Sequence, residues 1–355
     1  MTSYNLGFIG FGNVGRALAA LLGSRRSTVG ARYGIDYRVT GVASRRLGWW
    51  ADERGLDPAA PAGGRCADQR EWLTRARPDV VFETTPLDPH TGQPALDYLR
   101  ESLAAGAHAI SANKGPIVHG YRELARVAAA AGRQYLFEAA VMDGAPVFSL
   151  VRHCLPLAGL RGVRGVFTST ATVVLEALER GATIAHGVAE AQRLGVAESD
   201  PSYDVDGWDS AVKLCALAAV LFDASLAPTE VSRVGIANLD SHAVRRARAD
   251  GAPYRLVGRL RRESTGSVEA RVAPERVPAT DPLGVVRGTD LVVCYEADVF
   301  PGGLSVASGS PGLTTTAYGL FTDFLTAVGA LTGGSRLSAL GPRLSAKAGS
   351  RSGSA

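Results

Sequence analysis

Apolar residues recur with two different periods along the chain, and each period predicts a type of element. Short apolar runs, typical of strands buried on both faces, occur early in the chain at Asn5–Ile9, Tyr37–Ala43, Asp79–Pro86, Ala107–Ser111 and 134–138. Helical spacing follows the first run directly and recurs at 92–105 and 121–132. Because strands that alternate with helices form parallel sheets covered by helices, we expect an α/β fold here.

From about residue 148 the order of the elements changes. Helices are expected at 147–155, 171–180 and 183–193, and a closing helix from Thr314 to Val328. Strands are expected at 162–168, 230–236, 254–261, 267–273 and 291–296. This grouping is typical of mixed α+β material, so we expect a second domain of that type.

The first strand ends in the motif Gly10-Phe-Gly12-Asn13-Val14-Gly15, and a helical pattern begins directly after it. Gly10 allows a tight turn, Gly12 lets a pyrophosphate approach the backbone, and Gly15 lets the helix pack closely. The N-terminus of the helix then directs amide groups and positive potential at the phosphates. The motif in this context predicts a dinucleotide-binding Rossmann domain, with Asn13 and Val14 also at the cofactor.

Two strand ends carry candidate cofactor contacts. The second strand ends in Ser44-Arg45-Arg46, where a site that prefers NAD would carry an acid for the ribose hydroxyls. A serine and two arginines suit a 2′-phosphate, so NADP is favoured over NAD. The alternative is that they are ordinary loop cations at the start of a Pro/Gly-rich stretch. Thr84 and Thr85 follow the third strand, where a nicotinamide ribose would lie.

The segment Gly195–Lys213 concentrates acidic residues before one lysine. From Gly207 the pattern turns helical, with Asp206 expected as the N-cap and Asp209 as the acid of a capping box. Asp209 and Lys213 are four residues apart, so their head groups share one helix face. Acids suit an ammonium group and a lysine suits a carbonyl or carboxylate, so the cluster suits a small zwitterion. The alternative is a surface pair that contributes only ~0.3–0.5 kcal/mol.

Lysine usage favours the functional interpretation. The chain has 38 Lys plus Arg but only three lysines, which are Lys114, Lys213 and Lys347. A lysine can lose its proton near neutral pH when burial lowers its pKa, whereas a guanidinium stays charged. Lys114 follows the strand that ends at Ser111, at the edge where open α/β sheets build their sites. Lys114 and Lys213 are therefore candidates for chemistry.

The composition excludes several other classes of protein. The net charge of +4 arises in the last segment, which carries Arg336, Arg343, Lys347 and Arg351 and no acid. The basic pI is thus a property of a tail that we expect to be disordered, and it is not a nucleic-acid footprint. Four cysteines without metal spacing favour a reducing cytoplasm. No apolar run is long enough to span a membrane, and the N-terminus begins with a strand instead of a signal peptide.

With GFGNVG, TTP, SANKGP, FEAAVMDGAPV and AESDPSYDVDGWDSAVK in this order, the sequence resembles homoserine dehydrogenases of the short form, without a regulatory domain. The resemblance implies NAD(P)-dependent interconversion of L-aspartate 4-semialdehyde and L-homoserine, on the route to threonine and methionine, by a homodimer. It also implies a Rossmann domain at 1–146, a catalytic and dimerisation domain at 147–310, a helix at 311–332 that returns to the nucleotide domain, and a disordered tail at 333–355.

The resemblance also implies roles for individual residues. Lys213 would exchange a proton with the substrate oxygen, Asp209 would act beside it, and Lys114 would contact substrate or cofactor and share the proton relay. The remaining implied contacts fall into three groups: Glu198, Asp204, Asp209 and Thr170 for the substrate, Gly312 for the cofactor, and Glu138 with Val141, Asp143 and Ala145 for a monovalent cation such as Na⁺.

The sequence departs from the family pattern at the substrate end. Thr168 and Thr172 stand where asparagines are expected, and a hydroxyl cannot hold the geometry of a planar amide. The glycine-rich run near the closing helix is reduced to Ser308–Gly312. These changes leave open an oxidoreductase that acts on another small amino- or hydroxy-aldehyde. A third alternative, a non-catalytic NADP-binding protein, is disfavoured because the acids and the lysine are all present.

Overall fold

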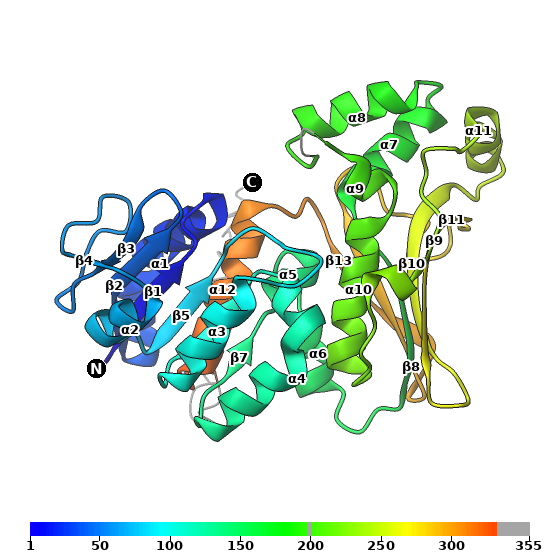
Figure 1. The fold of residues 1–355 in the computed structure, drawn as a ribbon. Coiled ribbons are helices and arrows are strands. Elements are labelled where there is room, and N and C mark those ends of the chain that lie inside the picture. Colours follow the sequence, from blue (N-terminus) through cyan, green and yellow to red (C-terminus); the bar gives the residue numbers. More distant parts are fainter. Residues whose placement is uncertain (198–199, 332–355) are drawn as a thin grey trace, which may run out of the picture.

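The computed structural model describes residues 1–197 and 200–331, which form two sheets with helices between and around them (Figure 1). The first sheet has seven strands in the order β4-β3-β2-β1-β5-β6-β7. Its strands are β1 (Thr2–Ile9), β2 (Ile35–Ser44), β3 (Gly48–Ala51), β4 (Gly64–Cys66), β5 (Val80–Glu83), β6 (His108–Ser111) and β7 (Tyr135–Leu136). All neighbouring pairs are parallel except β2–β3 and β3–β4, which form antiparallel hairpins.

The register of the parallel strands brings their carboxyl ends to one edge. Ile9 of β1 pairs with Glu83 of β5, which pairs with Ser111 of β6. Four helices accompany this sheet: α1 (Asn13–Tyr33), α2 (Gln69–Ala76), α3 (Ala95–Ala104) and α4 (Gly115–Ala130). The loops after β1, β5 and β6 therefore meet at one place, which is where a doubly wound sheet binds its ligand.

The second sheet has six strands in the order β13-β12-β8-β10-β11-β9. Its strands are β8 (Leu160–Val166), β9 (Ser232–Arg233), β10 (Tyr254–Arg262), β11 (Val268–Arg276), β12 (Leu291–Ala297) and β13 (Phe300–Ser308). The helices of this half are α7 (Ser169–Glu179), α8 (Ile184–Arg193), α9 (Ser202–Val205), α10 (Trp208–Leu221) and α11 (Ser241–Ala249), with a short 3₁₀ turn η1 at Pro228–Glu230. The two halves are connected by α5 (Ala139–Met142) and α6 (Phe148–Cys154).

Two elements join the halves. In Figure 1, α10 lies between the second sheet and α4, and its buried residues belong to a core shared with β8, β10 and α7. The last helix, α12 (Leu313–Ala327), crosses back to the first sheet and packs against α1 and α5. Phe324 of α12 contacts Tyr37 of β2 and Phe82 of β5 edge-on.

The α/β fold with an N-terminal Rossmann domain and a mixed second sheet is confirmed, with corrections to individual elements. The run at 134–138 forms only the two residues of β7, and 230–236 contributes only the two of β9. The helix expected at 121–132 begins at Gly115 because Pro116 is well suited to the first turn. The elements α2, β3, β4, α9, α11 and β13 were not predicted.

Candidate active site

The glycine motif has the geometry that its sequence predicts. Gly10 has φ +89°, and a Cβ there would lie 2.6 Å from the carbonyl carbon of Thr84. A Cβ on Gly15 would lie 2.9 Å from the carbonyl oxygen of Gly10, so the start of α1 packs directly on this turn. Gly12 is the N-cap of α1, and a Cβ built on it would have no neighbouring group within 4 Å. Asn13 and Val14 form the first turn of α1, with Asn13 exposed beside Gly12.

The two threonines after β5 use their hydroxyl groups within the protein. The Thr84 hydroxyl donates to the Gly10 carbonyl at 2.9 Å, and the Thr85 hydroxyl donates to Glu83 Oε1 at 2.5 Å. Both residues therefore fix the loops at the edge of the sheet, and contacts to a cofactor would fall to their backbone and methyl groups.

The arginine pair lies in the turn between β2 and β3. Ser44 ends β2 and its hydroxyl accepts a hydrogen bond from the Leu47 amide at 3.1 Å. Arg45 and Arg46 are exposed in the turn. A third cation lies beside this turn: the guanidinium of Arg65 is the group nearest to a Cβ built on Gly48, the residue that begins β3 directly after the turn. The turn thus carries a concentration of positive charge that can reach a phosphate group.

Asp209 and the two predicted lysines form one ion cluster whose side chains are mostly buried. The Asp209 carboxylate lies 2.8 Å from Lys213 Nζ and 3.2 Å from Lys114 Nζ, with each oxygen facing one lysine. Lys213 Nζ also donates to the carbonyl oxygen of Phe167 at 2.5 Å. The cluster joins α10 with the N-terminus of α4, so it lies between the nucleotide-binding sheet and the second sheet. The three side chains are only 12–17% exposed, which excludes the alternative of a solvent-exposed surface pair.

The charges in the cluster determine its protonation. Burial raises the pKa of the Asp209 carboxyl, but Lys114 and Lys213 outweigh it and hold that pKa far below its ordinary value. Burial lowers the pKa of Lys213, but Asp209, Asp143 and Asp204 together hold it above its ordinary value. The sequence argument, in which burial alone sets the pKa of Lys213, is therefore wrong in sign for this arrangement.

Asp204 lies beside the cluster and is held by Thr168, the N-cap of α7, and by Thr170 in its first turn. The Thr168 hydroxyl donates to one carboxylate oxygen at 2.9 Å, and the Thr170 hydroxyl lies 3.0 Å from the other and 2.7 Å from the Val196 carbonyl. Burial and the negative charge of Asp209 raise the pKa of Asp204, which the two hydroxyls oppose. Thr172 lies one turn further along α7, with its hydroxyl 3.4 Å from the Thr168 carbonyl. Glu198 lies outside the described residues.

The capping prediction for α10 is wrong. The helix begins at Trp208 after Gly207, which is the N-cap with φ +82° and has no side-chain hydrogen bond. Asp206 is the C-cap of α9, and Asp209 directs its carboxylate at the two lysines. A left-handed glycine supplies the turn into α10, which leaves the Asp209 carboxylate for the ion cluster.

The segment with the predicted cation ligands connects the halves. Glu138 Oε1 and Oε2 accept the amides of Phe148 and Ser149 at 2.7 and 2.8 Å, and the Ala145 carbonyl accepts the Val147 amide at 2.8 Å. Each carboxylate oxygen keeps a second lone pair, and carboxylate and carbonyl oxygens are the donors that hard cations take. The predicted set, with the carbonyls of Val141 and Asp143, therefore consists of oxygen donors of the kind that hard cations take. Side chains of His, Cys, Asp and Glu form no group of three suited to a metal within 1–197 and 200–331.

The predicted cofactor residue Gly312 forms the N-cap of α12, where its amide donates to Thr315 Oγ1 at 2.8 Å. Thr316 in the same turn donates to Asp143 Oδ1 at 3.2 Å. The start of α12 thus contacts the segment 138–145, which lies next to the ion cluster.

Sequence reasoning missed three features of the site. The hydrogen bond from Lys213 to the Phe167 carbonyl leaves no signal in the sequence, because every residue has a backbone carbonyl. The charge of the Asp143 side chain acts on Lys213. Glu83, Ser111 and Asn113 form a buried polar network under Lys114, and a glutamate at the end of an otherwise apolar strand is the signal that could have found it.

The Rossmann edge is suited to a pyridine dinucleotide, and the lysine–aspartate cluster lies between the two sheets beside it. Comparison with known proteins identifies the family. A family model described as homoserine dehydrogenase matches residues 146–325, and one described as the NAD-binding domain of homoserine dehydrogenase matches residues 10–138. The chain belongs to the homoserine dehydrogenase family.

Individual relatives agree with this assignment. The chain is 32% identical over 339 residues to an NAD(+)-dependent homoserine dehydrogenase of Pseudomonas canavaninivorans. This alignment covers 92% of this chain and 96% of that relative. It is 28% identical over 332 residues to a homoserine dehydrogenase of Methanocaldococcus jannaschii, at 89% and 96% coverage. A crystal structure of a putative homoserine dehydrogenase from Archaeoglobus fulgidus is similar with a TM-score of 0.79 and 28% identity, over 91% of this chain and 98% of that one.

Proposed function

We propose that this homoserine dehydrogenase uses Lys213 as the proton donor and acceptor for the substrate oxygen, with Asp209 and Lys114 completing the proton relay. The observation that carries the proposal is the contact of Asp209 with both mostly buried lysines, at 2.8 and 3.2 Å. A bound nicotinamide dinucleotide supplies or accepts the hydride. In reduction, the Lys213 ammonium gives its proton to the alkoxide that forms from the aldehyde. In oxidation, the hydroxyl proton of L-homoserine passes to the neutral amine of Lys213.

The remaining acids and hydroxyls hold the substrate. Asp204 and Asp209 offer carboxylates to the substrate ammonium group, and Thr168 and Thr170 keep Asp204 in place. Glu198 remains a substrate-binding candidate from the family resemblance alone. In this proposal the Thr168 hydroxyl replaces an amide as the donor to Asp204, and Thr172 contacts only the Thr168 carbonyl.

Initial rates of L-homoserine oxidation test the role of Lys213. We expect the wild type to turn over and Lys213→Ala to lose kcat by about 10²-fold or more, because general acid–base catalysis contributes on that order. Lys213→Arg keeps the charge but cannot release a proton, and it should be equally inactive. Turnover by either variant at the wild-type rate would sink the assignment of the proton donor.

We also propose that NADP is preferred over NAD, because Arg45 and Arg46 are exposed at the end of β2 with Arg65 nearby. The relative from Pseudomonas canavaninivorans is named as NAD(+)-dependent, and a hyperthermophilic archaeal homoserine dehydrogenase structure is described as a complex with NADPH. The double variant Arg45→Asp/Arg46→Ser should weaken NADP binding by about tenfold or more and spare NAD, since a 2′-phosphate loses charge-assisted hydrogen bonds. Arg70→Asp on α2 is the matched control, and equal effects on both cofactors would contradict the proposal.

A monovalent cation at Glu138, with the carbonyls of Val141, Asp143 and Ala145, is proposed to stiffen the connection between the halves. The support is the all-oxygen donor set. Na⁺ added to desalted protein should raise the Tm more than choline chloride at equal ionic strength, and Glu138→Gln should abolish the difference. An equal response to both salts would rule the site out.

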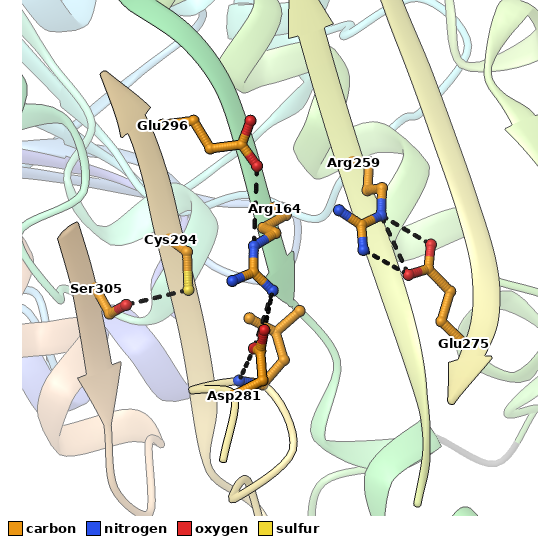
Figure 2. Close-up of polar contacts among 8 residues, drawn as sticks. Arg164, Arg259, Glu275, Asp281, Cys294, Glu296 and Ser305 are labelled. Carbon is orange, nitrogen blue, oxygen red and sulfur yellow. Dashed lines mark hydrogen bonds and ion pairs between the residues drawn. The ribbon is translucent and has the colours of Figure 1, made fainter. Parts of the chain in front are cut away.

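The outer face of the second sheet supports a homodimer. One row of paired residues crosses β13, β12, β8 and β10 on the outer face of this sheet: Ser305, Cys294, Arg164 and Arg259. The neighbouring residues Val163, Val293 and Leu260 point to the opposite face and are buried. Figure 2 shows the ion pairs of this face, with Arg164 on Asp281 and Arg259 on Glu275 at 2.6 Å. Arg164, Pro282 and Phe300 line a hollow of about 370 Å³ there. Part of this face packs against Val277, Leu283 and Val286, and we propose that a second copy of this chain covers the part that stays exposed.

Light scattering after size exclusion tests the dimer. We expect a mass of twice 37.0 kDa for the wild type. Ser305→Arg places a further cation in the row and should give the monomer, whereas Ser27→Arg on the exposed side of α1 should leave the dimer unchanged. A monomeric wild type, or a dimer that survives Ser305→Arg, would place the interface elsewhere.

The part of the chain that the structure describes contains no helix long and apolar enough to cross a membrane. Separately, the four free cysteines support the proposed cytoplasmic location.

A further inference from the structure

Glu83 is a fully buried glutamate that the proposed reaction does not use. It ends β5, its exposed fraction is 0%, and its strand lies between β1 and β6 in the centre of the nucleotide-binding sheet. A buried carboxyl group is costly unless it is paired or hydrogen-bonded, so its retention at the ligand-binding edge calls for a local reason.

The surroundings of Glu83 match an ionised carboxylate. Oε1 accepts the Thr85 amide at 2.7 Å and the Thr85 hydroxyl at 2.5 Å, and Oε2 accepts the Ser111 hydroxyl at 2.6 Å. The Thr85 amide can only donate, both hydroxyls are able to donate, and an ionised carboxylate is purely an acceptor. Burial raises the pKa of Glu83, and the hydrogen bonds from Ser111, Thr85 and Asn113 oppose that shift.

One arm of this network continues to the backbone on both sides of Lys114. Because the Ser111 hydroxyl donates to Glu83, its lone pairs face the Asn113 amide, which donates to it at 2.9 Å. Asn113 Oδ1 accepts the Gly115 amide at 3.0 Å, and Asn113 Nδ2 lies 3.3 Å from the Thr85 carbonyl. The residues on both sides of Lys114, Asn113 and Gly115, are therefore held by hydrogen bonds of the Glu83 network.

The turn leads directly to the ion cluster. The Lys114 carbonyl accepts the amides of Ile117 and Val118, which starts α4, and Lys114 Nζ reaches Asp209 at 3.2 Å. Packing adds to the fixation, because a Cβ on Gly115 would lie 2.9 Å from Cα of Gly92. A displacement of about 1 Å at a catalytic group can cost about 10²-fold in rate, so the position of this backbone matters to the reaction.

We propose that Glu83 is a positioning residue that acts through Ser111 and Asn113 to hold Lys114 against Asp209. The other carboxylate oxygen, through its bonds from Thr85, fixes the loop after β5. One buried acid therefore fixes both this loop, at the cofactor edge, and the backbone around Lys114. The inference rests on the proposed role of Lys114.

Glu83→Gln separates the two arms. The amide oxygen can keep both bonds from Thr85, and the amide NH₂ group then faces the Ser111 hydroxyl, which loses its acceptor. We expect the variant to fold, to bind NADP within about threefold of the wild type, and to lose kcat for L-homoserine oxidation by about tenfold or more. Ser111→Ala, which removes the same arm, should act alike and serves if Glu83→Gln folds poorly. Glu123→Gln, which alters a half-buried carboxylate of α4 paired with Arg100, should leave kcat unchanged.

A double-mutant cycle with Lys114→Ala distinguishes positioning from a general structural role. If Glu83 acts through Lys114, Glu83→Gln in the Lys114→Ala background should lower kcat by less than about twofold further. Thr85→Val removes a donor on the other arm, and its effect should multiply with that of Lys114→Ala.

The outcomes separate the two proposals. Wild-type kcat in Lys114→Ala alone would refute the role of Lys114 in the proposed function. If Lys114→Ala is impaired and Glu83→Gln is either silent or fully multiplicative with it, the positioning role of Glu83 is refuted and the role of Lys114 stands.

Discussion

At the scale of single residues, the site depends on one aspartate between two ammonium groups. Lys114 and Lys213 are both mostly buried, and the carboxylate of Asp209 faces both of them. Because that carboxylate and its neighbours outweigh the effect of burial, Lys213 is protonated at neutral pH. The protonated state suits reduction of the aldehyde, and oxidation of L-homoserine should therefore become faster as the pH rises into the alkaline range.

Asp209→Asn tests this balance. Without the carboxylate, burial dominates and the pKa of Lys213 falls, so the alkaline rise in the oxidation rate should move to lower pH. The variant also leaves two buried ammonium groups without their partner, which costs about 3–5 kcal/mol in comparable cases. We expect a lower Tm and a shifted pH–rate profile, whereas Asp206→Asn on the same segment changes neither. An unshifted profile would show that Asp209 does not control the proton of Lys213.

Thr168 gives a second prediction at this scale. Thr168→Val removes one of the two hydroxyls that stabilise the Asp204 carboxylate, so the pKa of Asp204 should rise further and the substrate ammonium should bind less well. We expect the KM for L-homoserine to increase by about tenfold, since hydrogen bonds to charged groups contribute about 1.5–3 kcal/mol. Thr168→Ser keeps the hydroxyl and should restore the wild-type KM. Equal KM values for the Val and Ser variants would contradict the role of this hydroxyl.

At the scale of elements, the sequence predicts what depends on local pattern. The order of strands and helices around the first sheet follows from apolar periodicity, and the glycine motif follows from local steric demands at Gly10 and Gly15. The strands β3 and β13 escaped prediction because hairpin pairing defines them. Phe300–Ser308 contains Pro301, Gly302 and Gly303, which weaken the strand signal and are tolerated because β13 is an edge strand.

The site shows the same limit. Spacing placed Asp209 and Lys213 on one helix face, but it could not decide whether Asp209 caps the helix or binds lysines, since one carboxylate can do either. The contact with Lys114, some 95 residues earlier in the chain, depends on how α4 and α10 pack. The sign of the pKa shift of Lys213 depends on that packing too, and no local pattern contains it.

The helix α2 offers a prediction at this scale. Its Trp72 is fully buried, donates to the Trp50 carbonyl at 2.9 Å, and lies over two glycines of the sheet. A Cβ on Gly41 would lie 2.6 Å from three atoms of the indole ring. Gly41→Ala should therefore destabilise the protein by about 1–3 kcal/mol, the usual cost of overpacking. Gly23→Ala on α1, where no atom lies within 4 Å, is the control and should be neutral or stabilising. Equal Tm values for the two variants would show that α2 can move away from the sheet.

At the scale of the whole molecule, the nucleotide-binding half is built from both ends of the described chain. Residues of α12 share one core with β1, β2 and α1, and Phe324 lies among Tyr4, Tyr37 and Phe82. The start of the same helix contacts Asp143 through Thr316, next to the ion cluster. Cofactor binding and the acid–lysine site are therefore connected through one helix as well as through α10.

Two truncations test how far the nucleotide-binding half depends on α12. A chain that ends at Ser310 loses Ala317, Leu320, Phe321, Phe324 and Leu325 from the core. At about 1.5–3 kcal/mol for each of the four large side chains, the loss of about 6–12 kcal/mol is comparable to the roughly 5–15 kcal/mol that stabilises a typical domain. We expect this chain to melt without a cooperative transition and not to bind NADP. A chain that ends at Leu331 keeps every described contact of α12 and should match the full chain in Tm and NADP affinity. If the chain that ends at Ser310 binds NADP as tightly as the chain that ends at Leu331, α12 is dispensable to the Rossmann domain and its packing on α1 serves only the second half.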